Sequence, residues 1–344
     1  MRNGVVTVRG VRVPARAPAP GVLLACCAMA TRFELLLPDL CPARRDHVGA
    51  ARLRAAGEEA LAAIVRLEAQ LSCHLPGSDI SRINARAARE PVRVEPALFE
   101  LLSHALRLYQ ETEGAFDVTI GPLMRCWGFA RGTGGVPGER ALARARACVG
   151  MHLVDLDPRR RTVRFARPGV QLDLGGIGKG WAIDRAVLAL RELGIERALL
   201  HGGTSSVYGI GAPPGEAGWK VAIEHPAAAG NACIGMVTLR DRALSVSAAH
   251  GRSFRVGDVR YGHVMDPVHA APARQADIAA VAGAAATDGD ALATALLALG
   301  PERARWLADR RPDLDVVVLA AAAAGTADLV WRRGITAPRM HEER

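Results

Sequence analysis

The sequence predicts an α+β fold in which mixed sheets and flanking helices form one compact unit. Helical patterns dominate up to residue 147. Short strand patterns follow from residue 151, without the regular alternation that a doubly wound parallel sheet requires. The 344 residues are 50% apolar, which is enough to bury a large core, and no Ser/Gly-rich linker divides them. We therefore do not expect two separate domains.

Apolar residues at helical spacing predict three helices in the first half of the chain. They cover residues 46–72, 96–112 and 139–147. Gly114 stands just after the second pattern, where a glycine commonly ends a helix.

Short apolar runs in the rest of the chain predict strands. A helix over residues 179–193 interrupts them, and helices over 288–299 and 302–308 follow near the end. The predicted strands cover residues 151–156, 163–165, 170–174, 198–201, 207–210, 221–224, 236–239, 244–247, 278–282 and 314–320.

Both ends of the chain are predicted to lie outside the folded unit, which covers residues 29–335. Residues 1–28 are interpreted as a disordered leader, with Met29 as an alternative start, and residues 336–344 as a tail. The sequence before Cys26 also resembles a lipoprotein cleavage site, although its apolar stretch is short and contains prolines. We expect a cytoplasmic protein, and the alternative is an exported lipoprotein anchored at Cys26.

Composition argues against two classes of protein. No apolar run reaches 18 residues, so we expect no transmembrane helix. The net charge of +9 comes almost entirely from arginines scattered among Asp and Glu, and aromatic residues make up only 4%. Because base stacking requires aromatic side chains among the cations, no nucleic-acid binding is expected. The seven cysteines lack C-x-x-C spacing and are interpreted as reduced thiols.

The densest candidate site is a glycine-rich turn between a predicted strand and a predicted helix, in residues 171–184. Its glycines let backbone N–H groups approach an anion, and the helix N-terminus adds partial positive charge, so a phosphate can bind there. Lys179, one of only two lysines in the chain, would face that phosphate. The spacing matches neither the Walker loop nor the dinucleotide fingerprint, and an ordinary structural turn is the alternative.

A second candidate site opens a predicted helix at residues 287–294. Asp290 and Thr294 are four residues apart and therefore lie on one helical face, and their oxygens are of the kind that Mg²⁺ accepts. The alternative is helix capping by Thr287 or Asp288, with Asp290 favoured in the first turn by the helix dipole.

Three weaker signals complete the set. His263 can transfer a proton near neutral pH, and Asp266 could orient it. The Gly202-Gly203 turn and the hydroxyls after it suit a polar ligand, and residues 114–129 could hold a flat ring. Taken singly, each has a structural alternative: a structural histidine, a polar turn and ordinary packing.

Together and in this order, these elements resemble the FAD:protein FMN transferases, the ApbE family. The resemblance extends from Met29 to Gly300. The matching stretches are residues 29–31, 72–84, 114–129, 172–184, 202–203, 219–226, 263–267 and 290–300.

The resemblance implies a single catalytic α+β unit that uses FAD as substrate and Mg²⁺ as cofactor. Such enzymes join FMN, through its phosphate, to a Thr or Ser hydroxyl of an acceptor flavoprotein and release AMP. Two alternatives stay open: an FAD pyrophosphatase that yields FMN and AMP at the same site, and a flavin-binding protein without catalysis.

The resemblance also assigns roles by position in this sequence. His263 falls at the catalytic position, and the metal ligands are Asp290, Thr294 and the carbonyl of Gly178. The implied contacts with FAD are Met29, His74, Ala115, Phe116, Asp117, Gly175, Lys179, Trp181, Asp184, Gly202, Gly203, Thr204 and Met265.

Four positions depart from the family pattern. His74 stands where an aromatic residue commonly stacks on the flavin, and Thr204 replaces the Asp of a Gly-Gly-Asp turn. Ala248 and Ala270 each replace a glycine. We expect these departures to affect substrate orientation and rate more than the fold.

Overall fold

The computed structural model describes residues 6–8, 11–13, 21–38, 47–224, 233–249, 251–320 and 330–336. The fold is α+β, as the sequence predicts, and within the described residues no helix is long and apolar enough to cross a membrane. The helices are α1 (His47–Leu71), α2 (Asp79–Arg86), α3 (Pro96–Glu111), α4 (Gly121–Cys126), α5 (Glu139–Arg146), α6 (Gly178–Glu192) and α7 (Ala286–Arg310), with short 3₁₀ turns at Phe129–Arg131 and Met151–Leu153.

The strands form sheets whose pairings are all antiparallel. The strands are β1 (Val6–Val8), β2 (Val11–Val13), β3 (Gly21–Ala28), β4 (Thr31–Pro38), β5 (Val92–Arg93), β6 (Val154–Asp157), β7 (Thr162–Phe165), β8 (Ala198–Gly202), β9 (Ser206–Ile210), β10 (Trp219–Glu224), β11 (Cys233–Leu239), β12 (Arg242–Ala248), β13 (Ser253–Val256), β14 (Val259–Gly262), β15 (Met265–Asp266), β16 (Ala271–Pro272), β17 (Ala276–Gly283), β18 (Asp315–Ala320) and β19 (Val330–Arg333).

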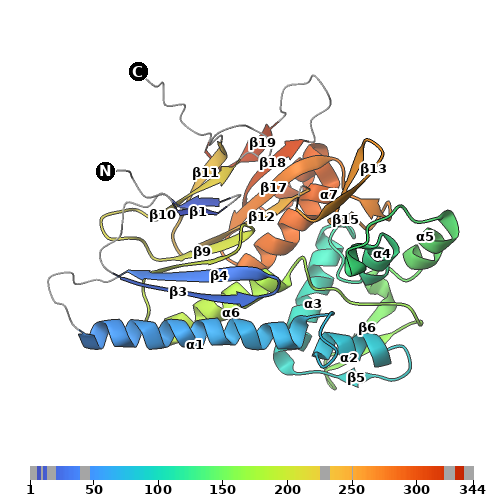
Figure 1. The fold of residues 1–344 in the computed structure, drawn as a ribbon, viewed down its shortest axis with the longest axis horizontal. Helices are drawn as coiled ribbons and strands as arrows, with labels where there is room; N and C mark the ends of the chain where they lie inside the picture. Colours follow the sequence, from blue (N-terminus) through green and yellow to red (C-terminus); the bar gives the residue numbers. More distant parts are fainter. Residues whose placement is uncertain are drawn as a thin grey trace.

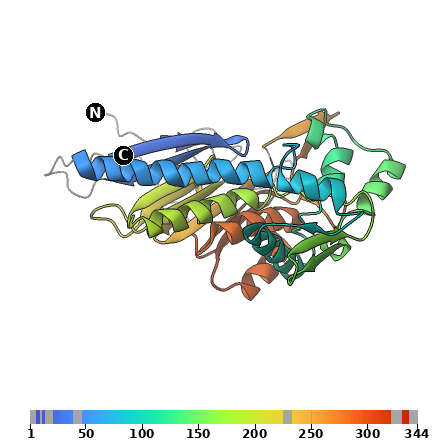
Figure 2. The same cartoon turned by 90° about the horizontal axis from the view of Figure 1, so that it is seen from below.

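The central element is an eight-stranded sheet in the order β19-β18-β17-β12-β9-β8-β4-β3. Helices α1, α6 and α7 pack on one face of it (Figures 1 and 2). On this face Phe33 of β4 packs with Ile64 of α1 and Ile183 of α6. Strands β10 and β11 cover the other face, where Val221 packs with Leu244. Burial on both faces explains why the central strands are almost continuously apolar.

A smaller group of elements lies at the far end of α1 (Figure 1). It contains α2 to α5, the three-stranded sheet β5-β7-β6 and the hairpin β13–β14. Its core is continuous with the inner face of α7, because Ile80, Leu101 and Phe165 belong to the same buried cluster as Leu296. The two parts therefore share one core, and the segments predicted to carry chemistry lie where they join.

The prediction of a disordered leader is wrong for three strands, β1, β2 and β3. Strand β3 pairs with β4 over its whole length, and Met29 and Ala30 make the turn between them, both with positive φ. Val22 and Ala28 are buried in the core that α1 covers. Tertiary burial of this alternating strand decides its structure.

The folded unit extends one residue beyond its predicted C-terminal boundary at residue 335. Thr336, assigned to the tail, forms an isolated β-bridge with Met236, and the rest of the predicted tail lies outside the described residues.

The segment 170–174 is extended but joins no sheet, contrary to the predicted strand. The side chain of Asn84 replaces a neighbouring strand: its Oδ1 accepts from Leu172 N at 2.7 Å, and its Nδ2 donates to Leu172 O at 2.9 Å. Asp173 N donates to Val118 O at 2.8 Å. The strand prediction is wrong here because its backbone groups are satisfied by a side chain and a loop.

Candidate active site

The glycine-rich turn leads from the extended segment 170–174 directly into α6. Gly175 N donates to Asp173 Oδ1 at 2.9 Å, and this bond forms a tight turn before the helix. Gly180 lies against the start of α7, where a Cβ atom at this position would come within 2.2 Å of Ala286 O. Only glycine permits α6 and α7 to approach so closely here.

Asp290 on α7 faces this turn. Its side chain is almost fully buried, and its Oδ2 accepts a hydrogen bond from Gly180 N at 3.1 Å. Lys179 Nζ lies 3.2 Å from Asp290 Oδ1 and donates to Gly175 O at 3.1 Å. Two motifs more than 100 residues apart in sequence therefore meet, as the sequence hypothesis required.

Thr294 lies one helical turn after Asp290 and faces the same turn. Its Oγ1 donates to Asp290 O at 2.9 Å and lies 3.3 Å from Ser247 Oγ on β12. A Cβ atom on Gly176 would lie 3.3 Å from Thr294 Oγ1, so the hydroxyl borders the glycine-rich turn.

The donors present fit Mg²⁺ rather than a softer metal. The described residues contain no group of three or more His, Cys, Asp and Glu side chains that could hold a metal. Asp290 and Thr294 instead offer a carboxylate and a hydroxyl, and Gly178 begins α6 beside them. Mg²⁺ is commonly held by one or two carboxylates together with substrate phosphates and water. A site with this composition would therefore need the phosphates to complete it.

His263 follows β14 and lies near enough to Lys179 and Asp173 for their charges to act on its ring. Its backbone N donates to Arg252 O at 2.9 Å, and its ring Nδ1 lies 3.2 Å from the same oxygen. Burial lowers the pKa of His263, and the positive charges of Arg252 and Lys179 lower it further. The Nδ1–Arg252 bond fixes Nδ1 as the donor, which leaves Nε2 as a free acceptor among the described residues. The neutral ring can therefore accept a proton at neutral pH.

The segment 115–117 lies beside the glycine-rich turn. Phe116 is buried, and its ring lies 3.5 Å from the position of a Cβ atom on Gly176. Asp117 is buried beside it and accepts from Thr119 N at 2.7 Å and from Thr119 Oγ1 at 2.6 Å. Burial raises the pKa of Asp117 to about 6, despite these two hydrogen bonds.

The Gly202-Gly203 turn meets the turn between β3 and β4. Gly203 N donates to Arg32 O at 2.8 Å, and its φ of +59° suits glycine. A Cβ atom there would lie 2.1 Å from Thr31 Oγ1. Met29 N donates to Glu68 Oε1 at 2.7 Å, and Thr204 is exposed. This wall is built from backbone and small side chains.

Asp184 holds α7 in place. Its Oδ1 accepts from Ala286 N and its Oδ2 from Thr287 N, each at 2.8 Å. Burial raises the pKa of Asp184. The predicted capping of this helix by Thr287 or Asp288 is therefore wrong, because Asp184 on α6 supplies the cap. Asp288 instead bonds His104 at 2.6 Å and Arg311 at 2.9 Å.

Four further predicted contacts lie in different surroundings. His74 is exposed, and its backbone N donates to Ser72 Oγ at 3.2 Å. Met265 is buried in a cluster with Leu123 and Ala270. Trp181 is buried, with the Arg185 guanidinium 5.7 Å from its ring centre. Ala115 is buried next to Phe116. As contacts with FAD, all four stay predictions.

Three residues to which the sequence interpretation assigned no role also shape the site. Asn84 holds the segment before the turn, Asp173 closes the turn, and Ser247 contacts Thr294. The rarity of Asn and the Asp two residues before Gly175 were the available signals for the first two. No local signal identified Ser247 as a neighbour of Thr294, because the contact depends on how β12 packs against α7.

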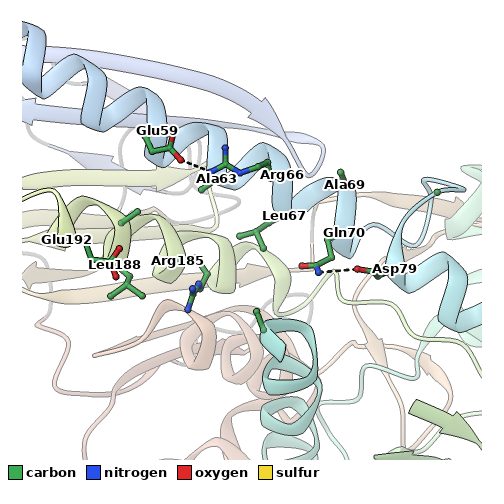
Figure 3. Close-up of a pocket in the computed structure, with 13 residues that line it drawn as sticks. Glu59, Ala63, Arg66, Leu67, Ala69, Gln70, Asp79, Arg185, Leu188 and Glu192 are labelled. Carbon is green, nitrogen blue, oxygen red and sulfur yellow. Dashed lines mark hydrogen bonds and ion pairs between the residues drawn. The ribbon is translucent and has the colours of Figure 1, made fainter. Parts of the chain in front are cut away.

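A separate hollow of about 610 Å³ lies between α1 and α6 (Figure 3). Its lining includes Glu59, Arg66, Arg185 and Leu188, and an ion pair of 2.7 Å joins the first two. None of the residues that meet at the glycine-rich turn lines this hollow. We therefore do not assign the candidate chemistry to it.

The chain was compared with known proteins. The model of the ApbE family matches residues 29–318. The FAD:protein FMN transferase of Treponema pallidum (strain Nichols) is 31% identical over 320 residues, which cover 87% of this chain and 88% of that protein. The FAD:protein FMN transferase of Klebsiella pneumoniae (strain 342) is 30% identical, over 76% of this chain and 82% of that protein.

Two solved structures have the same fold. The ApbE protein from Thermotoga maritima superimposes with a TM-score of 0.79 at 26% identity, over 92% of this chain and 97% of that one. The flavin transferase ApbE from Vibrio cholerae gives 0.78 at 26% identity, over 92% and 98%. With the family match spanning most of the sequence, these findings show that the chain belongs to the ApbE family.

Proposed function

We propose that the protein is an FAD:protein FMN transferase that uses Mg²⁺. It takes FMN from FAD, attaches it through a phosphoester to a Thr or Ser hydroxyl of an acceptor flavoprotein, and releases AMP. The observation that carries the proposal is the contact of Lys179 and Gly180 with Asp290, together with the electrostatic interaction between Lys179 and His263. The names of the relatives support the same reaction.

The residues at the turn suit a diphosphate. Backbone N–H groups at the start of α6 and the Lys179 ammonium would bind its oxygens. Asp290, Thr294 and Gly178 would hold the magnesium ion, which neutralises charge on the phosphate oxygens when bound. Lys179 now pairs with Asp290, and this pair would rearrange on binding so that the lysine faces the phosphates.

In this proposal His263 acts as the general base. The acceptor hydroxyl loses its proton to His263 Nε2 as its oxygen forms a bond to the phosphorus of the FMN half. The bond from that phosphorus to the bridging oxygen breaks, and AMP leaves with the bridging oxygen. The proton held by His263 then passes to the solvent or to the leaving phosphate. A single general base of this kind contributes about 100-fold to 10,000-fold in rate.

The test is incubation of the full chain with FAD, Mg²⁺ and a candidate acceptor flavoprotein. The proposal predicts AMP release and an acceptor whose mass increases by that of FMN less one water. Release of free FMN with AMP, and no labelled acceptor, would identify an FAD pyrophosphatase instead. FAD binding without either product would identify a flavin-binding protein without catalysis. Repeating the reaction with EDTA tests the metal requirement.

We also propose a cytoplasmic location rather than a lipid anchor at Cys26. Cys26 lies within β3 and is half-buried, with its Sγ 3.9 Å from Leu61 O on α1. Burial also raises the pKa of this thiol. N-terminal sequencing of the native protein tests the proposal, and a mature chain that begins at Cys26 would contradict it.

A further inference from the structure

Two segments distant in sequence form what we call the basic lobe, defined as residues 121–149 and 251–275. Aromatic side chains hold them together: Trp127 lies 5.5 Å from Tyr261, and Phe129 lies 5.3 Å from Phe254. Both views of the fold place α4, α5 and the β13–β14 hairpin together at one end of the molecule (Figures 1 and 2).

The lobe carries most of the net charge of the chain. Its 54 residues include nine arginines and three carboxylates, a net charge of +6. The other 290 residues carry the remaining +3 of the chain's +9. The arginines are dispersed along the sequence, but the fold brings these nine into one region.

Several of these arginines are free, in contrast to many arginines elsewhere. Within the described residues, Arg140, Arg144 and Arg255 are exposed and pair with no carboxylate. Outside the lobe, Arg191 pairs with Asp241 at 2.9 Å, and Arg303 pairs with Glu113 at 2.8 Å. The free charges are available to a partner.

The hairpin places two of these arginines next to each other. Arg255 and Arg260 are directly opposite in the β13–β14 register. Arg260 Nε donates to Ser253 Oγ at 2.9 Å, while the exposed Arg255 pairs with no carboxylate among the described residues.

The lobe borders the catalytic site on the side of His263. The β13–β14 ladder continues from Ser253↔Gly262 to the bond between Arg252 O and His263 N. An antiparallel strand advances by about 3.4 Å per residue, so Arg260 and His263, which are three residues apart, are separated by about 10 Å. Lys179 and the glycine-rich turn face His263 from α6. A hydroxyl that reaches His263 from outside the molecule would thus pass the basic lobe.

We propose that the basic lobe binds an acidic segment of the acceptor protein, next to the hydroxyl that receives FMN. This inference rests on the proposed transferase function and adds the chemistry of the partner. Opposite charges on the two surfaces accelerate encounter and fix orientation. Half-exposed Val256 and Val268 lie among the arginines and offer apolar contact as well.

An acidic protein segment fits this surface better than a nucleic acid does. Base stacking requires accessible aromatic faces. Trp127 and Phe129 are buried, and the rings of Phe254 and Tyr261 stack on each other 5.2 Å apart within the same cluster. The lobe therefore offers charge to a partner, while its aromatic rings are buried or half-buried against one another.

The test measures binding of two short peptides of equal length to the full chain. Each carries a central threonine, flanked in one peptide by Asp and Glu and in the other by Gln. We expect the acidic peptide to bind about tenfold more tightly at low salt. This difference in affinity should disappear at high salt, because ions screen the charges of exposed arginines. Arg144→Glu with Arg255→Glu would remove that advantage, while the affinity for FAD stays unchanged.

The matched control reverses two charges at the other end of the molecule, Arg52→Glu with Arg54→Glu at the start of α1. This control is expected to bind both peptides as the wild type does. Equal binding of the two peptides, or equal loss in the control, would overturn the inference. So would a preference of the wild type for phosphatidylglycerol vesicles or an RNA oligonucleotide over the acidic peptide.

This experiment is separable from the proposed function because it needs no FMN transfer. A chain that binds the acidic peptide but never labels an acceptor would contradict the transferase proposal alone. A chain that labels its acceptor equally well after the lobe charges are reversed would contradict only the inference about the lobe.

Discussion

The junction of α6 and α7 and the basic lobe, which contains His263, hold their charged side chains in opposite ways. At the junction, Asp290 and Asp184 are held by backbone N–H groups, and Lys179 is paired. In the lobe, Arg144 and Arg255 are exposed and unpaired among the described residues. Paired charges in a tight junction suit a substrate of fixed shape, whereas free charges suit a partner protein that arrives from solution.

The largest expected effect is at the junction. Asp290→Ala removes a buried carboxylate that we assign to the metal, so we expect kcat/KM for AMP release to fall about 1,000-fold. Calorimetry of FAD binding with and without Mg²⁺ would show whether the coupling between the two ligands is lost.

Asp288→Ala is the matched control on the same helix. This change breaks the bonds to His104 and Arg311, so it lowers the thermal midpoint but leaves turnover well below that temperature unchanged. Full activity of Asp290→Ala would rule out the metal assignment.

His263→Ala comes next. We expect FMN transfer to fall at least about 100-fold while FAD affinity is retained, because the general base is lost and the diphosphate site is not. In the wild type, the neutral imidazole is the active form and its pKa lies below the ordinary value. The rate therefore rises with pH through that lowered pKa and then levels off. Wild-type rates in the variant would remove His263 from the mechanism.

Asp117→Asn tests whether the buried negative charge of Asp117 destabilises the folded protein. Burial raises the pKa of Asp117 to about 6 in the folded protein, above the ordinary value of an aspartate. The folded state thus binds a proton more tightly than the unfolded state, and stability falls as pH rises from about 4 through about 6.

At pH 7 we expect Asp117→Asn to raise the free energy of unfolding by up to about 3 kcal/mol, and at pH 4 to change it little. Urea unfolding at both pH values measures this difference. An equal effect at the two pH values would show that the carboxylate charge is not the cause.

Gly180→Ala tests the close approach of the two helices. The new Cβ atom would meet Ala286 O, so α6 and α7 must separate, and we expect a loss of about 2 kcal/mol in the free energy of unfolding. Gly77→Ala is the control, because nothing lies within 4 Å of a Cβ atom there. Similar unfolding curves for the two variants would mean that the junction adapts freely.

The smallest effect is expected in the lobe. Arg255→Ala removes an exposed arginine that faces Arg260, so the free energy of unfolding should change by less than about 0.5 kcal/mol. Thermal unfolding measures it. A loss of several kcal/mol would mean that this arginine is structural, and the contrast between junction and lobe would disappear.

The sequence predicted the fold class and most helices because apolar periodicity reports burial on one face. The predictions for residues 21–28 and for the segment 170–174 were wrong for different reasons. Gly21–Ala28 forms a hairpin with β4, the next strand along the chain, and its burial depends on α1, which packs over it. Leu172 is satisfied by Asn84, 88 residues away in sequence, instead of a neighbouring strand. The contacts with α1 and with Asn84 do not appear in any local sequence pattern.

The same limit applies to the site. Spacing alone placed Asp290 and Thr294 on one helical face, and the glycines indicated an anion site. The family resemblance predicts that these pieces lie together. The clustering of charge could not be predicted, because the nine arginines of the lobe come from two segments that are distant in sequence. Those segments are joined by packed aromatic rings and by hydrogen bonds such as that from Trp127 Nε1 to Ala270 O at 3.0 Å.

The bonds from Asp184 to the first turn of α7 have a consequence for local motion. Asp184 lies on the helix that begins with the glycine-rich turn, while Asp290 lies one turn beyond the amides that Asp184 holds. The amides of Ala286, Thr287 and Gly180 should then exchange with deuterium at one common rate, as a single cooperative unit. Opening that unit would separate the two halves of the catalytic machinery while the rest of the protein stays folded.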